Sequence, residues 1–305
     1  MTKLAISLAT RARPDRLLEQ IKRSVVNWGH PNTYMQIQVD ADDQATIKAL
    51  ESAMPFEALL PLDTQRIEVN IKPREDTVAG KWNRILNVPA DIYCYHADDD
   101  PYITKDYDWK IIEAAGRFPD KIGTVFGHLA NLSFSCTYAA TAKYCELLGY
   151  LLPPYFPYWF CDHWTDDVAR MTGRIAFANI TTDQGRPGVT MEMREPYWWA
   201  TFFDAAYLMR RSQAHAIIDH PHFVCPQWQK QLLKTGHPLI EVRSRMLNQQ
   251  VRNQSPELSR WAGNLPFDER YTRTKQQAIA MVPHLLNDYG MPEKEQQMFR
   301  KMLGV

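Results

Sequence analysis

The chain has 305 residues, 45% of them hydrophobic, and its 35 basic residues balance 35 acidic ones. This length allows one large domain with a sizeable core, and no apolar run is long enough to predict a membrane span. The N-terminal residues lack the apolar segment and cleavage site of a signal peptide. Five widely spaced cysteines without a CxxC pair argue against a zinc ribbon or a disulfide framework, so we expect a reducing, cytoplasmic location.

The charge is unevenly distributed along the chain. Residues 205–305 contain 14 Lys and Arg against 8 Asp and Glu, a net of +6, so residues 1–204 carry a net of −6. An acidic first part suits a cation site. The basic last third suits an anionic acceptor such as DNA, but an ordinary solvated helix surface is the interpretation with the better prior.

Short apolar or alternating runs, each followed by a helical pattern, fill the first hundred residues. The expected strands are 4–8, 35–39, 66–71 and 92–96, and the expected helices are 15–28, 44–53 and 77–86. This order predicts an α/β fold with a mainly parallel sheet. In such sheets, ligands bind at the carboxyl ends of the strands.

Three of these four strands end in polar clusters. The clusters are Thr10/Arg11/Arg13, Asp40/Asp42/Asp43 and Asp98/Asp99/Asp100. Pro101 stops the fourth strand because it offers no N–H to a neighbouring strand. Adjacent carboxylates repel each other unless a cation or a solvated turn neutralises them. The last cluster is therefore either an Asp-rich turn or a divalent-metal site for a phosphate-bearing ligand.

Beyond residue 110 the pattern changes. We expect strands at 122–126, 131–138 and 175–180 and a helix at 139–148. The proline- and aromatic-rich residues 149–160 predict an irregular segment, which is either a wall of an acceptor pocket or a packed structural loop. The aromatic stripe in residues 195–207 is more typical of a core than of a sugar platform.

An acidic segment opens the helix expected to end at Gly173. Asp162 or Thr165 can cap this helix, but capping does not account for Asp162, His163, Asp166 and Asp167 together. After residue 210 the sequence predicts only helices with polar connections. The expected helices are 212–219, 226–234, 239–254, 272–288 and 293–303.

Four segments in the first half resemble motifs of GT-A fold glycosyltransferases of the broad family 2 type. SLATRARPDRLLEQIKRSV resembles the opening strand and loop, and QVDADD resembles the acidic loop near the nucleoside. AGKWNRIL resembles the helix beneath the sugar-phosphate, and HADDDPYITKDYDW resembles the DxD region. The resemblance extends more weakly to about residue 207. It rests on the order and spacing of the four motifs rather than on any one of them.

The resemblance implies a GT-A (Rossmann-like) α/β domain at residues 1–209 with a helical C-terminal extension at 210–305. It implies nucleotide-sugar contacts by the residues that match the motifs: Thr10, Arg11, Arg13, Asp40, Asp42, Lys81, Asp98 and Asp99. Asp100 falls on the metal side of the motif, and the expected ion is Mn²⁺ or Mg²⁺, which neutralises the diphosphate leaving group. The triple Asp leaves this register open by one residue.

His163 and Asp166 match an HxxD pattern, in which the aspartate is the general base of inverting enzymes. Asp166 is therefore the predicted base, with Asp167 and Asp162 as alternatives. Relatives place a metal-binding His after the strand at 175–180. This chain has no His there, so Asp183 or water would replace it.

The leading hypothesis is a metal-dependent, inverting glycosyltransferase that uses a nucleoside-diphosphate sugar, with a UDP-sugar as the expected donor. The acceptor is a bacterial glycan or a modified base in phage-type DNA, for which the arginines of the last third are candidates: Arg243, Arg245, Arg252, Arg260, Arg270 and Arg273. A nucleotidyltransferase is the alternative enzyme, although the loop after the first strand lacks its usual glycines. A non-catalytic nucleotide-binding module is the third hypothesis. The sequence leaves the oligomeric state open.

Overall fold

The computed structural model describes residues 1–53, 66–98, 100–127, 138–157, 159–183, 195–235, 237–262 and 269–305, without the side chains of 254–262. Asp99 and most of the strand expected at 131–138 lie outside these ranges. The chain divides into two compact units, of which the first is Met1–Leu152 with Ile175–Gly188. The second is Pro153–Arg174 with Val189–Val305. The domain division predicted at residue 209 stays a prediction, and this grouping places residues 195–209 with the C-terminal helices.

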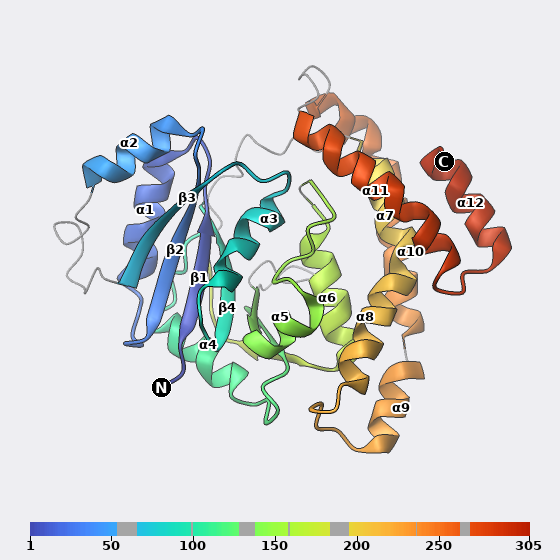
Figure 1. Cartoon of the computed structure of the whole chain (residues 1–305), viewed down its shortest axis with the longest axis horizontal. Helices are drawn as coiled ribbons and strands as arrows, with labels where there is room; N and C mark the ends of the chain where they lie inside the picture. The colour runs from blue at the N-terminus through green and yellow to red at the C-terminus, as the bar shows by residue number, and fades with distance from the viewer. Residues whose placement is uncertain are drawn as a thin grey trace. The chain divides into compact units, whose positions relative to one another are not determined.

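Seven strands of the first unit form one sheet in the order β3-β2-β1-β4-β6-β5-β7 (Figure 1). They are β1 (Leu4–Ala9), β2 (Thr33–Asp40), β3 (Ile67–Lys72), β4 (Ile92–Ala97), β5 (Thr124–Gly127), β6 (Tyr138–Thr141) and β7 (Ile175–Ala178). Only β6 runs antiparallel to its neighbours, β4 and β5, among the strands that the structure describes. The predicted mainly parallel sheet is thus confirmed.

The helix expected at 139–148 begins later than predicted. Residues 139–141 pair with β4, so that Ala139 lies opposite Cys94 and Thr141 lies opposite Ile92. Helix α5 then runs over Ala142–Leu148 and ends at Gly149, whose φ of 79° suits glycine. The alanines are good helix formers, but pairing in the middle of a buried sheet outweighs that local preference.

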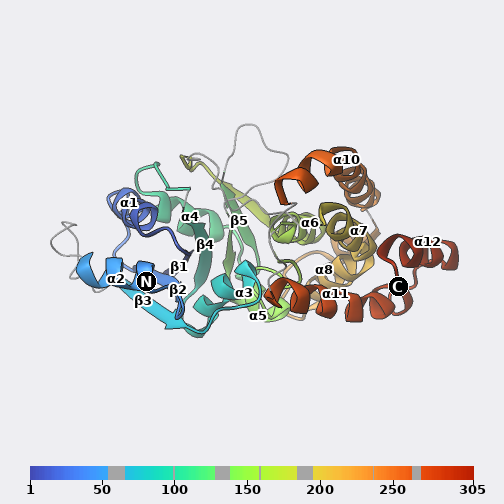
Figure 2. The same cartoon turned by 90° about the horizontal axis from the view of Figure 1, so that it is seen from above.

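The two faces of the sheet are covered by different helices. Helices α1 (Pro14–Val25), α2 (Gln44–Ala53) and α4 (Tyr107–Ala115) share one face, with Leu17, Leu50 and Ile111 packed into the core beneath them. Figure 2 shows α1 and α4 on one side and α3 (Val78–Asn83) on the other. Helix α3 continues into a 3-10 turn, Arg84–Asn87. It therefore lies beside the sheet face that carries Ser7 and Tyr95.

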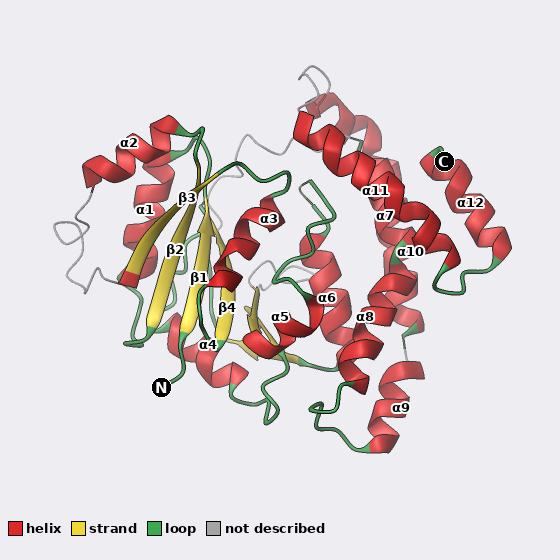
Figure 3. Cartoon of the chain, in the orientation of Figure 1, coloured by secondary structure: helices red, strands yellow, loops and turns green. Residues whose placement is uncertain are grey.

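The described part of the second unit is helical (Figure 3). Its helices are α6 (Cys161–Thr172), α7 (Pro196–Ala205), α8 (Tyr207–Asp219), α9 (Gln227–Thr235), α10 (Pro238–Ala262), α11 (Glu269–Asn287) and α12 (Glu293–Leu303). Trp199, Phe202 and Phe203 of α7 are nearly inaccessible and surround Phe156. The aromatic stripe is therefore core, as expected. None of the described helices combines the length and the apolar character needed to cross a bilayer.

Candidate functional site at the strand ends

The polar clusters after β1 and β4 meet at one edge of the sheet. These strands are adjacent and parallel, with Ala9 opposite Ala97, so the residues that follow them emerge side by side. The Thr10 hydroxyl donates to Asp98 Oδ2 at 2.8 Å, and Arg13 donates to Asp98 Oδ1 at 2.9 Å. Asp98 is 7% exposed. Both oxygens of this carboxylate are thus oriented from the first loop.

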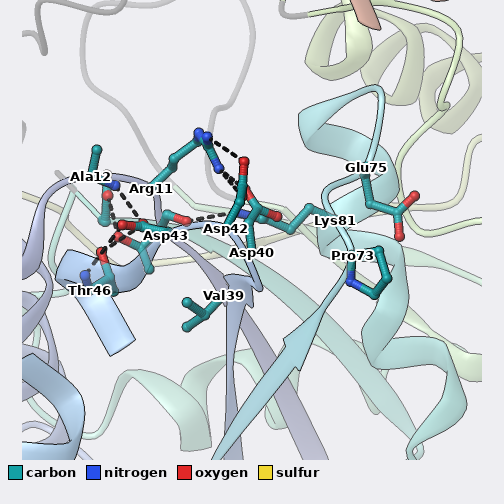
Figure 4. Close-up of polar contacts among 12 residues, drawn as sticks. Arg11, Ala12, Val39, Asp40, Asp42, Asp43, Thr46, Pro73, Glu75 and Lys81 are labelled. Atoms are coloured by element: carbon teal, nitrogen blue, oxygen red, sulfur yellow. Dashed lines mark hydrogen bonds and ion pairs between the residues drawn. The ribbon is translucent and has the colours of Figure 1, made fainter. Parts of the chain in front are cut away.

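Asp40, at the end of β2, is the centre of a second group of charges (Figure 4). Its carboxylate lies 2.7 Å from Lys81 Nζ, 3.0 Å from Arg11 Nη1 and 3.7 Å from Arg84 Nη2. Its side chain is only 2% exposed. Three cations around one buried carboxylate compensate its desolvation, which a single exposed partner would not do.

Arg11 joins this buried group to the surface. It donates to both oxygens of Asp42, at 2.7 and 3.0 Å, in a bidentate pair. The hydrogen bond to Asp42 raises the pKa of Arg11 and lowers the pKa of Asp42. The Asp42 side chain is about half exposed. The outer part of the cluster is therefore accessible from solvent, whereas Asp40 is not.

Lys81 reaches the same edge from α3 on the opposite face. Its Nζ donates to the Thr10 carbonyl at 2.6 Å as well as pairing with Asp40. Burial lowers the pKa of Lys81, and the bond to Asp40 opposes that shift. Thr77 caps α3 by accepting a hydrogen bond from the Gly80 amide. This cap fixes the start of the helix and so the backbone position of Lys81. Lys81 thus ties α3 to the ends of β1 and β2.

Asp43 holds the loop between β1 and α1 in place. Its Oδ2 accepts from the Ala12 amide at 2.7 Å and from the Thr46 hydroxyl at 2.7 Å. Ala12 has a φ of 53°, an uncommon conformation for a residue with a side chain. This bond stabilises the strained turn that separates Arg11 from Arg13. Asp43 is part of the quoted acidic cluster, but the sequence reasoning gave it no separate role.

Arg84 and Glu75 also belong to the cluster, and the sequence reasoning missed both. Arg84 donates to Glu75 at 3.1 Å and to the Pro73 carbonyl at 2.5 Å. Arg84 follows Lys81 by three residues, which places both on one helix face. That spacing was a usable signal for Arg84. No local pattern identifies Glu75, because it comes from the loop after β3.

His96, in β4, contacts the turn that follows this strand. Its Nε2 lies 2.8 Å from the Asp100 carbonyl oxygen, and burial lowers its pKa to about 4. The imidazole is therefore neutral at pH 7. Asp100 is partly exposed. Asp99 lies outside the described residues.

Asp183 lies near this turn, but its side chain points elsewhere. Its amide donates to the Pro101 carbonyl at 2.9 Å, while its carboxylate pairs with Arg23 at 2.5 Å. Among the described residues, no group of three or more His, Cys, Asp or Glu side chains is placed to bind a metal ion. Substitution of the missing His by Asp183 stays a prediction, and the Arg23 pair would have to open for it.

The second unit contains the acidic helix α6. Asp166 is buried, with Arg170 Nε at 2.8 Å and Arg243 Nη1 at 2.5 Å from its Oδ2. Asp167 pairs with the fully buried Arg210 at 3.0 Å. Burial raises the pKa of Asp167, and the positive charges of Arg210 and Arg243 oppose that rise. These two carboxylates join α6 to α8 and α10.

Asp162, in the first turn of α6, has a different environment. Its side chain is 23% exposed, and its Oδ1 lies 3.0 Å from His163 Nδ1. Burial alone would raise its pKa, but the adjacent His163 makes the net shift downward. Of the three candidate bases, Asp162 has the carboxylate that solvent reaches, whereas Asp166 and Asp167 are buried and pair with arginines.

Comparison with known proteins identifies similar structures but no similar sequences. No protein-family model matches the chain, and neither does any curated protein. TarS residues 1–349 from S. aureus, solved with UDP-GlcNAc, matches with a TM-score of 0.51 at 11% identity, covering 99% of this chain and 87% of that one. A second structure of the same fragment gives a TM-score of 0.50 at 10% identity with the same coverage.

A mannosyltransferase from Pyrobaculum calidifontis, solved with GDP-Man and Mn²⁺, gives a TM-score of 0.49 at 12% identity, covering 94% of this chain and 88% of that one. Against a longer TarS structure, the match covers 53% of that chain. The TarS matches extend over nearly the whole chain, and at these identities they show a common fold. The chain has the GT-A fold, as its sequence motifs predicted.

Proposed function

We propose that the chain is a glycosyltransferase that moves a sugar from a nucleoside-diphosphate donor to a hydroxyl acceptor. The observation that carries this proposal is the convergence of Thr10, Arg11, Arg13, Asp40, Lys81 and Asp98 at one sheet edge. The carboxyl edge is where α/β folds bind ligands. The TarS fragment of similar fold was solved with UDP-GlcNAc, which supports a UDP-sugar as the donor.

Within this site we assign Asp40 and Asp42 to the nucleoside side and Arg11 to the phosphates. Asp40 is buried under three cations, so its role is to hold Arg11 and Lys81 in place. The exposed Asp42 is then the carboxylate that reaches a ribose or base. Arg11 is 35% exposed, so a diphosphate can replace Asp42 as a partner of its guanidinium while Arg11 keeps its contact with the buried Asp40.

The aspartates after β4 fit a divalent ion that arrives with the diphosphate. Mg²⁺ and similar ions use one or two carboxylates and complete their shell with phosphate oxygens and water, so a preformed cage of three side chains is not required. Asp98 is oriented by Thr10 and Arg13 and is assigned to the ribose side with Asp99. Asp100 is assigned to Mn²⁺ or Mg²⁺, which when bound would neutralise charge on the departing diphosphate.

The general base is assigned to the first turns of α6, where the sequence favours Asp166. We prefer Asp162 over Asp166, because Asp166 is buried and its Oδ2 is held by Arg170 and Arg243. An acceptor hydroxyl would have to displace one of these arginines to reach that oxygen. Asp162, partly exposed beside His163, accepts the acceptor's proton in an inverting displacement.

A glycan is the preferred acceptor. Arg243 and Arg245 are taken up by ion pairs with acidic residues of the second unit, as is Arg273. Arg252 donates to Tyr197. The Arg260 side chain lies outside the described residues. Paired arginines contribute less to phosphate binding than unpaired ones, which makes modified DNA the second choice.

The test is a panel of nucleotide sugars with Mn²⁺, in which the released nucleotide is identified by mass spectrometry. We expect release of a nucleoside diphosphate, whereas pyrophosphate would identify a nucleotidyltransferase. Donor binding without turnover by any acceptor would identify a binding module. Parallel reactions with glycans and with hydroxymethylated duplex DNA decide the acceptor.

Three variants examine the residue assignments. Asp100→Asn should weaken Mn²⁺-dependent donor binding, while Glu113→Gln, at an exposed position of α4, should not change it. Asp162→Asn should lower kcat by about a hundredfold or more with donor affinity retained. If Asp162→Asn keeps full activity and Asp166→Asn folds but is inactive, Asp166 is the base. An unchanged donor affinity in Asp100→Asn would refute the metal assignment.

A further inference from the structure

Helix α9 of the second unit turns its most apolar side chains toward solvent. Val224, Trp228 and Leu232 are 62%, 67% and 59% exposed. Trp228 and Leu232 are four residues apart, so they share one face of the helix, and Val224 lies in the segment just before α9. No residue of α9 is buried. An exposed tryptophan and leucine side by side need an explanation, unlike single exposed apolar residues.

The other side of this segment is anchored to the unit. Phe223 is 3% exposed and lies beneath the Arg174 guanidinium at 4.1 Å and Lys230 Nζ at 5.5 Å. Arg174 also donates to the Val224 carbonyl at 2.7 Å. Leu233 lies against Gly173 at the end of α6. These contacts pack one side of the segment against the rest of the unit. The exposure of the other side is therefore not a result of loose packing.

Positive charge surrounds this face. Residues 220–240 contain no Asp or Glu. The cations near the segment are Arg174, Lys230, Lys234 and Arg211, which is one helical turn before His215, whose ring bonds the Lys234 backbone. Asp219 is the carboxylate that pairs with a cation of this segment, Lys234, at 2.5 Å. Glu241, at the start of α10, is paired with Arg245. The four cations therefore outnumber Asp219 and Glu241 and leave the segment with excess positive charge.

We propose that the exposed surface formed by Trp228 and Leu232 of α9, together with Val224 just before it, docks on an anionic lipid surface. A seated amphipathic helix with Trp and Leu outward and basic residues around them has the composition of interfacial helices. The apolar exposure continues at the start of α10, where Leu239, Val242 and Met246 are 81%, 51% and 58% exposed. A single short helix offers less apolar area than a stable protein interface needs, whereas a lipid surface accepts a small insertion assisted by charge.

The experiment is co-sedimentation of the full chain with phosphatidylcholine vesicles that do or do not contain phosphatidylglycerol. We expect binding only when the anionic lipid is present and a decrease with added salt. Trp228→Gln and Leu232→Gln should each lower the partition coefficient by about tenfold, because each removes one inserted apolar side chain. Trp109→Gln, which changes an exposed tryptophan of the first unit, should leave it unchanged.

Both α9 substitutions are at exposed positions, and an unchanged thermal unfolding midpoint would show that they preserve the fold. Equal vesicle binding by wild type and the two α9 variants would overturn the proposal, as would equal binding to neutral and anionic vesicles. Light scattering supplies a further outcome: if wild type self-associates without lipid and Trp228→Gln is monomeric, the face is an interface between copies and the proposal is wrong. The result does not depend on glycosyl transfer.

Discussion

The two units each contain a cluster of aspartates and basic residues, but the clusters differ in exposure. At the strand ends of the first unit, the Arg11 and Asp42 side chains are 35% and 52% exposed. In the second unit, Asp167 and Arg210 are 2% and 0% exposed. In the first cluster, ion pairs at the rim can exchange for a ligand. In the second, every exchange would leave a buried charge without its partner.

This difference shows that acidic sequence motifs do not by themselves distinguish a binding site from a structural element. Arg210 donates to the Phe203 carbonyl at 2.5 Å and to Ser244 at 2.7 Å, and it stacks on the Phe203 ring at 3.8 Å. It therefore joins α7, α8 and α10 to Asp167 of α6. The segment that resembles a catalytic motif thus also carries the buried connection of the helical unit.

The largest stability effect should come from breaking that buried connection. Arg210→Met leaves the Asp167 carboxylate buried without its principal partner and should lower the free energy of unfolding by about 3–5 kcal/mol. Urea denaturation measures the change. Arg245→Ala, at an exposed pair with Glu241 and Glu295, is the control and should cost about 1 kcal/mol or less. Equal losses in the two variants would contradict the contrast between buried and exposed clusters.

The second largest effect should be a loss of stability at acidic pH caused by His96 of the first unit. The folded pKa of His96 is about 4, below its ordinary 6.5, because burial disfavours the charged ring. Above pH 6.5 the ring is neutral in both the folded and the unfolded chain, so it costs no stability. As pH falls from 6.5 to 4, the unfolded chain binds a proton that the folded chain does not, and the free energy of unfolding decreases. The loss should reach about 3 kcal/mol. The slope of unfolding free energy against pH should be shallower over this window in His96→Gln, and an unchanged slope would show that His96 is not responsible.

Lys81→Met should have a smaller effect, because Asp40 keeps Arg11 and Arg84 as partners. The Thr10 carbonyl loses its donor, so the expected cost is about 1–3 kcal/mol. Donor affinity should fall as well, because the first loop is then less ordered. Denaturation and titration with UDP measure the two quantities on one variant. A stable variant with unchanged UDP affinity would remove Lys81 from the proposed site.

The smallest stability effect is expected at Asp42. Asp42→Ala removes an exposed bidentate pair with Arg11 and should cost about 1 kcal/mol or less. Its effect on donor binding should be larger than its effect on stability if Asp42 contacts the nucleoside. Isothermal titration of UDP, with thermal unfolding of the same sample, measures both. A loss of stability that exceeds the loss of affinity would make Asp42 a structural residue.

Several features of the chain followed from the sequence alone. Alternating and apolar runs predicted the strands of the first unit because burial on one face or two imposes that pattern. The helix at Gln44–Ala53 has the predicted bounds. The polar residues after β1, β2 and β4 could be expected to meet, because adjacent parallel strands present their carboxyl ends at one edge.

Other features depended on tertiary contacts. Residues 139–141 became a strand because β4 and β5 offered hydrogen-bonding partners, which local propensity does not record. The distinction among Asp162, Asp166 and Asp167 came from arginines on α6, α8 and α10 that are up to 77 residues away in the chain. A sequence motif specifies which groups can ionise. The fold determines which of them are buried and paired, because burial and distance control the cost of a charge.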